Sequence, residues 1–356
     1  MKKIKLKKNV LVDYATYAGV TLAFVIVTML NSSGRLSSSM QGQLVPICCY
    51  IVMALSLNLT VGVLGELSLG HAGFMSVGAF SGVIAAMSLQ SAIPFVPARL
   101  AVAMLVGAFF AAITGLVVGV PVLRLRGDYL AIVTLAFGEI IKDLINCLLV
   151  GYDKNGLHMA FNFKGNLTIN DLGLADGGIA IIKGAQGATG TQTIASFTAG
   201  FVLIIITLVV ILNLVRSRSG RAIMALRDNR IAAESVGINV TKYKLMAFVT
   251  SAALAGAAGA LYGLNYSNLA AAKFNFNTSI LVLVFVVLGG LGNMWGSIIA
   301  AALLYVLPEL LRSFADYRML IYAIVLILVM LATNSEPVKA TFARLFHFRK
   351  GGQENG

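Results

Sequence analysis

The stretch Arg216–Lys244 reads RSRSGRAIMALRDNRIAAESVGINVTKYK and is the most basic part of the sequence away from the two chain ends. Apolar runs lead into it and out of it, at Ile204–Val215 and Leu245–Leu264. With their flanking residues, both runs are long enough to cross a hydrocarbon core of about 30 Å at about 1.5 Å per helical residue. The stretch is therefore predicted to be a loop between two membrane spans. Its excess of Lys and Arg places it in the cytoplasm.

The middle of this loop, Ala222–Val236, contains neither Pro nor Gly and is rich in good helix formers. Gly237 follows at a position where the C-terminus of a helix favours glycine. We predict one short helix on the inner membrane face, where another protein can reach it. The alternative is a lipid-bound surface helix whose charges act only as a topology signal. Asp228 and Glu234 interrupt the positive charge and favour the protein partner.

The composition is that of a membrane protein. Hydrophobic residues make up 58% of the chain and charged residues 12%, and the mean hydropathy is +0.89. The apolar residues fall in blocks of about 18 to 25, which predicts α-helical spans and not the weakly alternating strands of a membrane barrel. The net charge of +13 sits in the cytoplasmic segments, so it indicates topology and no nucleic-acid partner. The three cysteines have no zinc-site spacing, so we expect no metal.

These blocks predict about ten spans in a single all-α transmembrane domain, 1–356, with both termini in the cytoplasm. The basic segment 1–12 and the tail 334–356 are cytoplasmic. The polar, Gly-rich segment 151–193 is placed outside the cell, without a core of its own. The fifth span is expected at about Tyr129–Val150 and the tenth ends near Thr333.

Two spans are interrupted by glycine, one in each half of the chain. The first interruption, Gly62–Phe74, makes a continuous helix doubtful and contains three candidate residues of a translocation path: Gly70, His71 and Gly73. The second is a Gly-rich turn after a short span at Ser279–Leu288, with Gly289, Gly290, Gly292 and Gly296. The pair suggests inverted repeats, spans 2–5 and 7–10, with a substrate site near the repeat interface.

Three ionisable residues lie within the fifth span. Spacings of three and four place Glu139, Lys142 and Asp143 on one helical face, and Glu139 lies near the middle of the membrane. They either pair with one another as a structural cluster or line a path through the membrane.

The sequence shows no catalytic constellation, so we expect no enzyme and no bound cofactor. It has no G-x-x-x-x-G-K-[ST] motif, and its three histidines are too scattered to form a metal site. A transporter of this kind needs an energy source. Either ions flow along the charges of the fifth span, or another subunit supplies ATP hydrolysis through the basic loop.

Three segments resemble the permease subunits of branched-chain amino-acid ABC importers, of the LivM type. They are SLGHAGF at Ser68–Phe74, RLRGDYLAIVTLAFGE at Arg124–Glu139, and GRAIMALRDNRIAAESVGIN at Gly220–Asn239. The turn at Gly289–Gly296 also matches, and the resemblance covers about residues 40–333. It implies a multi-pass protein of the bacterial inner membrane, paired with a second related permease, two cytoplasmic ATPases that use the ATP, and an extracytoplasmic binding protein.

The resemblance also implies a mechanism, in which the loop 216–244 docks on an ATPase and closure of the ATPase pair drives alternating access. The docking residues would be Arg227, Asp228, Arg230, Ile231, Ala232, Ala233, Glu234 and Gly237. The substrates implied are leucine, isoleucine and valine. The alternatives are a permease of the same family for urea or short amides, and an ion-coupled secondary transporter that uses the charges of the fifth span.

Overall fold

The computed structural model describes residues 2–35, 37–125, 127–154, 156–163, 172–174 and 178–314, with isolated positions from 317 to 327. Its contacts divide the chain into two units, 1–302 and 303–356. The second unit contains the end of helix α11 and the short 3₁₀ helix η5, Leu311–Phe314. All other described helices and strands lie wholly in the first unit. The predicted tenth span and the tail 334–356 lie almost wholly outside the described residues.

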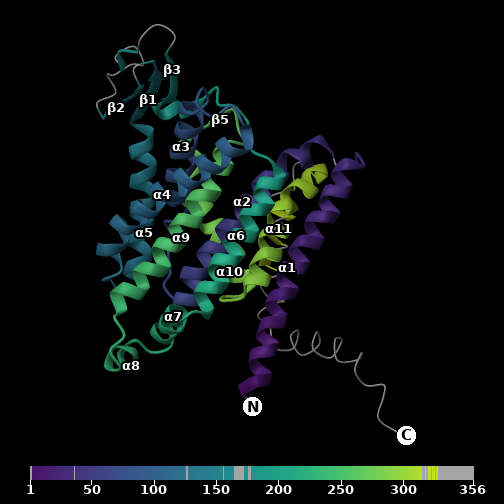
Figure 1. Cartoon of the computed structure of the whole chain (residues 1–356), viewed down its shortest axis with the longest axis vertical. Coiled ribbons are helices and arrows are strands. Elements are labelled where there is room, and N and C mark those ends of the chain that lie inside the picture. Colours follow the sequence, from purple (N-terminus) through teal and green to yellow (C-terminus); the bar gives the residue numbers. More distant parts are fainter. Residues whose placement is uncertain are drawn as a thin grey trace. The chain divides into compact units, whose positions relative to one another are not determined.

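The described chain is mainly helical (Figure 1). The helices are α1 Lys2–Ser32, α2 Ser38–Asn58, α3 His71–Ser88, α4 Val96–Val122, α5 Asp128–Asn146, α6 Phe197–Arg216, α7 Arg218–Asp228, α8 Arg230–Ser235, α9 Val240–Gly263, α10 Phe276–Gly289 and α11 Met294–Leu310. Six of the described helical segments are long and apolar enough to cross a membrane, and two shorter apolar ones, Thr16–Ser32 and Met294–Leu310, join them. A multi-pass helical protein is thus confirmed. The number ten, the location of the termini and the inverted repeats stay predictions.

Helix α9 is the centre of the bundle, and it packs most extensively against α3 and α4. The contacts depend on glycine. A Cβ atom on Gly78 would lie 2.1 Å from the carbonyl oxygen of Gly256, and one on Gly259 would lie 2.0 Å from that of Met75. Backbones therefore touch where side chains normally intervene. The Ala- and Gly-rich run Ala255–Ala260 of α9 thus allows close helix approach.

The prediction of a purely α-helical chain is wrong in one region, which forms a five-stranded antiparallel sheet. Its order is β2-β1-β3-β4-β5. The strands are β1 Leu148–Asp153, β2 Gly156–Phe161, β3 Ile179–Lys183, β4 Ala188–Thr189 and β5 Asn268–Leu269. The fifth span accordingly ends at Asn146 and not at Val150. Its last apolar residues enter β1, because a short apolar run suits a strand as well as a helix.

Within the segment 151–193, Ile181 and Ile182 of β3 are at most 1% exposed. That the segment has no core of its own and lies outside the cell stays a prediction. The strands cannot be recognised in the sequence, because each is only two to six residues long and the connections between them are polar and Gly-rich.

The predicted break after the second span is confirmed. Helix α2 continues into one π-helical stretch, η1 (Leu59–Leu64), and ends at Gly65, whose φ of +81° suits glycine. The chain then runs without helix to Gly70, and α3 begins at His71. We call 65–70 the unwound segment. Residues 264–275 connect α9 to α10 and contain β5 and a short 3₁₀ helix, Ala271–Lys273.

The single helix predicted over Ala222–Val236 is two helices. Asn229 has an extended backbone (φ −156°, ψ 106°) between α7 and α8, and its side chain accepts a hydrogen bond from the Ala232 N–H at 3.0 Å. Asn229, as the N-cap of α8, therefore divides the predicted helix in two, although the residues around it favour a continuous helix. The C-terminus is placed correctly, because Gly237 (φ +84°) follows α8.

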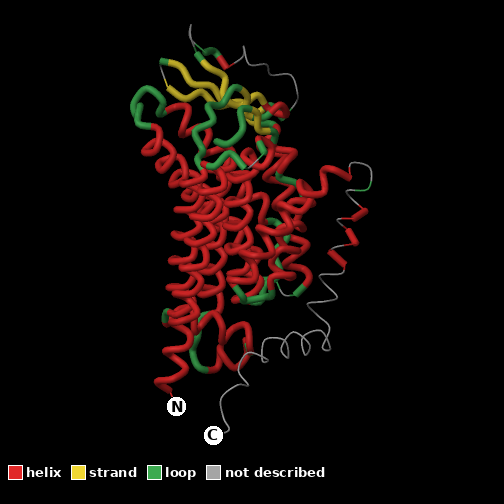
Figure 2. The backbone as a smooth tube through the Cα atoms, turned by 90° about the vertical axis from the view of Figure 1, so that its right-hand side faces the viewer, coloured by secondary structure: helices red, strands yellow, loops and turns green. Residues whose placement is uncertain are grey.

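The sheet and the α7–α8 pair lie at opposite ends of the helical bundle (Figures 1 and 2). The sheet continues beyond the end of α5, and the two short helices follow α6 at the other end. The bundle between them contains the two interruptions. This arrangement separates two candidate sites, one at the α7–α8 end and one inside the bundle.

Candidate functional site

The α7–α8 pair is a folded surface and not a flexible loop. Ser217 caps α7 by accepting from the Gly220 N–H at 3.1 Å. Behind the surface, Leu226, Ala233 and Val240 are each at most 9% exposed and pack together. Ala233 was predicted to lie at a docking contact, and it instead fills this small core. Through this core, both helices pack against the first turn of α9.

The outward side of the pair combines exposed apolar side chains with paired charges. Ile231 is 79% exposed and Val236 74%. Between them in sequence, Glu234 accepts from the Arg230 Nε at 3.0 Å. Of the other predicted docking residues, Asp228, Ala232 and Gly237 are also exposed. We call the exposed residues of 228–237 the coupling surface.

Arg227 makes a contact with the bundle that the sequence did not predict. Its side chain is 45% exposed, and Nη1 donates to the carbonyl oxygen of Gly62 at 2.7 Å. Its Nε also lies 3.5 Å from the Asp228 carboxylate. The residue therefore connects α7 to the end of the α2–η1 helix.

The two glycine interruptions meet beside this arginine, joined by Asn58. Its amide oxygen accepts from the Gly292 N–H at 2.8 Å, and its amide nitrogen donates to the Asn293 carbonyl at 3.1 Å and to the Ser297 hydroxyl at 2.9 Å. Asn58 is fully buried. The turn at Gly289–Gly296 is thus a packing site at this end of the bundle, where Gly296 would clash with the Gly289 carbonyl if it carried a Cβ atom.

We expect Asn58→Ala to lower the free energy of unfolding by about 2–4 kcal/mol, because it removes the hydrogen bonds of a fully buried side chain and leaves a cavity in its place. Unfolding in mixed detergent micelles would measure the change. Asn213→Ala, at an exposed position of α6, is the matched control and should change the stability little. Equal stability of the two variants would contradict the bridging role of Asn58.

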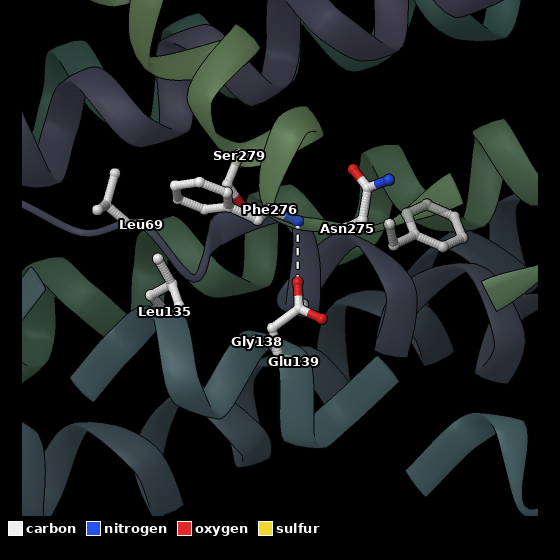
Figure 3. A pocket seen from close by; sticks show the side chains of 9 residues that line it. Leu69, Leu135, Gly138, Glu139, Asn275, Phe276 and Ser279 are labelled. Carbon is white, nitrogen blue, oxygen red and sulfur yellow. Dashed lines mark hydrogen bonds between the residues drawn. The ribbon is translucent and has the colours of Figure 1, made fainter. Parts of the chain in front are cut away.

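The second site is a small niche where α3, α5 and α10 meet (Figure 3). Four separate segments line it. The lining residues are Leu69, Gly73, Leu135, Gly138, Glu139, Phe274, Asn275, Phe276 and Ser279. They come from the unwound segment, the first turn of α3, the middle of α5 and the start of α10.

The first turns of α3 and α10 meet at this niche. The Glu139 carboxylate accepts from the Phe276 N–H at 2.9 Å, as Figure 3 shows, and the Ser279 hydroxyl accepts from the Ala72 N–H at 3.1 Å. The N-terminus of a helix has unpaired N–H groups and a positive dipole end, so it favours a carboxylate. Glu139 occupies such a position.

Glycine closes the niche on the α3 side. A Cβ atom on Gly70 would lie 2.1 Å from the Thr134 carbonyl oxygen, and one on Gly73 would lie 2.9 Å from the Cα of Gly138. Thr134 also accepts from the Leu69 N–H at 3.0 Å through its hydroxyl. The α3 and α5 backbones are therefore in direct contact here.

The charged cluster of α5 is partly paired and partly open. Lys142 forms an ion pair with Glu139 and lies 3.9 Å from the Asp143 carboxylate. The side chain of Asp143 is 72% exposed and that of Glu139 33%. Glu139 and Lys142 thus pair with one another, as the structural alternative expects. The alternative that the cluster lines a path through the membrane stays a prediction.

His71 lies next to the niche but does not line it. The residue is 2% exposed, and its Nε2 is 2.7 Å from the Ser56 hydroxyl of α2. It acts as a packing residue between α2 and α3. Gly73 lines the niche, and Gly70 packs against Thr134 beside it. Their place on a translocation path stays a prediction.

Comparison with known proteins gives the chain its family. The family model described as "Branched-chain amino acid transport system / permease component" matches residues 39–331. The chain belongs to this family. It is 36% identical over 293 residues to the "High-affinity branched-chain amino acid transport system permease protein LivM" of Escherichia coli (strain K12), and 37% identical over 293 residues to the protein of the same name from Salmonella typhimurium (strain LT2).

These alignments cover 79% of the chain and 66% of each relative, slightly less than two thirds of its length. No solved structure matches the chain. The residues matched by the permease-family model include the coupling surface, the unwound segment and the niche. Both candidate sites are thus parts of the region shared with other permeases.

Sequence reasoning missed several residues of this permease. Asn275, Phe276 and Ser279 were assigned to a loop and to the start of a short span, and they form one wall of the niche. The ion pair between Glu66 and Lys244 was also missed, although Glu66 stood out as a charge within apolar sequence. An Asn three residues before Thr278 is an N-cap signal, and it would have placed the start of α10 correctly.

Proposed function

We propose that the chain is the membrane-spanning permease subunit of an ABC importer in the bacterial inner membrane. It pairs with a second related permease, two cytoplasmic ATPase subunits and an extracytoplasmic substrate-binding protein. The chain itself binds no cofactor, and its partners hydrolyse the ATP. The family and the names of the relatives support this proposal.

The observation that carries the proposal is the coupling surface. Ile231 on the short helix α8 and Val236 directly after it are more than 70% exposed outside the spans, beside the Arg230–Glu234 pair. Apolar side chains ringed by polar ones are typical of protein contacts. The surface is also anchored to the bundle through its own small core. A subunit that pushes on it would therefore move α7 and the start of α9 together.

The proposed orientation places the coupling surface in the cytoplasm and the sheet outside. The basic residues of 216–244 support it. Both termini are then cytoplasmic, and spans 2–5 and 7–10 are proposed to be inverted repeats. Helices α3 and α10, which follow the unwound segment and the connection 264–275, meet at the niche and support a repeat interface at that point.

The niche is proposed to be a contact point on the translocation path. Its walls contain Leu69, Leu135, Phe274 and Phe276, which suit an aliphatic side chain. Glu139 supplies a carboxylate for an ammonium group. This chemistry fits leucine, isoleucine or valine better than it fits urea or a short amide, which would need more polar walls. Rocking of one bundle against another would open the niche alternately to either side.

The test of this function is a detergent pull-down of the tagged protein from its native membrane, with every co-purifying protein identified. We expect ATPases with a P-loop and a second permease. A protein that purifies alone, and whose uptake collapses with the proton gradient, would instead be an ion-coupled transporter that uses Glu139, Lys142 and Asp143.

We expect Glu234→Lys to lower uptake at least about tenfold and to weaken the association of the ATPases, because it breaks the pair with Arg230 and reverses a charge at the centre of the surface. Membrane insertion should be unchanged. Thr241→Lys adds a lysine at an exposed position of α9 and serves as the control. Normal uptake by Glu234→Lys would count against docking at this surface.

A further inference from the structure

The end of the α2–η1 helix is held by a side chain from α7. The last carbonyl groups of a helix have no partner within it, and the helix dipole makes them negative. The carbonyl of Gly62 is one of them, and it accepts from the Arg227 guanidinium at 2.7 Å. A cation from a separate element thus caps this helix at the point where the chain unwinds.

The Arg227 side chain occupies a space beside two glycine turns. A Cβ atom on Gly65 would lie 2.6 Å from Cγ of Arg227, and one on Gly292 would lie 3.8 Å from its Nη1. Both glycines have positive φ angles, +81° and +80°. The side chain of Arg227 therefore passes between the two interruptions, one from each half of the chain. A residue that only docked on a partner would not need this fit.

A second basic side chain holds the start of the unwound segment. Lys244 of α9 forms an ion pair with Glu66, and the two side chains are 5% and 16% exposed. A buried pair of this kind is costly to break from one side, because the remaining charge has no partner. Two cations from the α7–α9 region thus hold Gly62 and Glu66, at the end of η1 and the start of the unwound segment.

The other end of the unwound segment leads to the niche. The Leu69 N–H donates to the Thr134 hydroxyl of α5, and Leu69 is part of the niche wall. Two residues later, α3 begins at His71. A displacement of Gly65 and Glu66 can therefore reach the first turn of α3 through six residues of chain that no helix supports.

We propose that Arg227 and the Glu66–Lys244 pair transmit the movement of the coupling surface to the unwound segment, and through it to the niche. The proposal rests on the function proposed above. It makes Arg227 a positioning residue that acts through Gly62, whereas Ile231 and Glu234 contact the ATPase. Loss of Arg227 then separates ATP hydrolysis from transport without separating the subunits.

The test uses the complete complex in lipid vesicles and compares Arg227→Ala, Arg227→Lys and Arg221→Ala. Bound ATPase, ATP hydrolysis and uptake of labelled leucine are measured for each. We expect Arg227→Ala to keep its ATPases and their hydrolysis while uptake per ATP falls at least about tenfold, within the usual range of coupling between sites. Arg227→Lys should recover part of the loss. Arg221 is exposed on the same helix and bonds only to the neighbouring Arg216 carbonyl, so its removal should change nothing.

Two results would overturn the proposal. Unchanged uptake per ATP in Arg227→Ala would show that the arginine transmits nothing, and loss of the ATPases from that variant would make it a docking residue. Absence of ATP-dependent uptake in the unmodified complex would instead reject the proposed function itself, so the two failures are distinguishable.

If Arg227→Ala does not accumulate in the membrane, the neutral double variant Glu66→Gln/Lys244→Met provides a second test of the proposal. A merely structural buried pair can be replaced by neutral residues at little cost, and uptake would then be normal. We expect uptake per ATP to fall as in Arg227→Ala. Normal uptake would overturn the proposed role of the pair.

Labelling of the niche gives a readout that does not depend on transport. Leu69→Cys is introduced after Cys48, Cys49 and Cys147 are replaced by serine, and its reaction with N-ethylmaleimide is followed with and without ATP and vanadate. We expect nucleotide to change the labelling rate when Arg227 is present and not when it is alanine. The same change in both backgrounds would overturn the proposal.

Discussion

Gly256→Val is expected to remove folded protein from the membrane. Gly256 lies in the middle of α9, and a Cβ atom there would be 2.3 Å from the Cβ of Ala111 and 2.5 Å from the carbonyl oxygen of Gly107. On its opposite side, the Gly256 carbonyl is the atom that a Cβ on Gly78 would meet. The helix is therefore enclosed by α3 and α4 at one level. It cannot shift away from one neighbour without striking the other.

The size of the effect follows from what the new side chain meets. Overpacking of a core costs about 1–3 kcal/mol when flexible side chains can move aside. Here one of the two closest obstacles is backbone and the other is a Cβ atom, neither of which can change rotamer, so we expect a larger loss. The amount of monodisperse protein extracted from membranes, and its thermal unfolding, would measure the loss.

Gly42→Val is the matched control, since Gly42 lies in helix α2 with open space around it. Its yield should be close to that of the unmodified protein. Gly256→Ala should be intermediate, and Ala111→Gly should recover part of its stability by removing the closer of the two contacts. A Gly256→Val protein as stable as the control would mean that the three helices do not pack as described.

Much of this packing could be predicted from the sequence. Runs such as Ala255–Ala260 predict close helix contacts. The Gly-rich interruption at 62–74 predicts a break in the helix, which the structure confirms. These features depend on local backbone chemistry, which a single sequence displays. The strands of the sheet were missed for the opposite reason. Each is short, and β5 comes from a segment about eighty residues away from β4.

The site residues divide in the same way. Glu139 is visible in the sequence because a charge within a span is costly and therefore informative. Its partner Phe276 is not visible, because the contact uses a backbone N–H that every non-proline residue possesses. Arg227 was assigned to the docking surface from its neighbours in sequence. Only the fold shows that its guanidinium turns toward Gly62.

Glu139→Gln is expected to lower the rate of leucine uptake at least about tenfold, which corresponds to an increase of about 1.4 kcal/mol in the activation free energy of transport. Glutamine has the same shape and keeps an oxygen that can accept from the Phe276 N–H, so α5 and α10 should stay in contact. What disappears is the charge that would receive the substrate's ammonium group. Bound ATPases and the thermal stability should remain near normal.

The partner lysine separates a path residue from a structural one. Glu139→Gln leaves Lys142 with only the Asp143 carboxylate at 3.9 Å as a counter-ion, and this change alone could impair the protein. The double variant Glu139→Gln/Lys142→Met removes both charges. If the pair is only structural, two neutral side chains replace it at little cost and uptake returns. If Glu139 receives the substrate, uptake stays low although stability recovers.

Glu139→Asp completes the comparison, because it keeps the charge but shortens the reach to the Phe276 N–H by one methylene group. A carboxylate needed for its charge should retain more uptake as aspartate than as glutamine. A carboxylate needed to hold α10 in place should show the reverse order. Higher uptake in Glu139→Gln than in Glu139→Asp, together with recovery in the double variant, would make the niche a closed packing contact. The translocation path would then have to be sought along the exposed face of α5, where Asp143 lies.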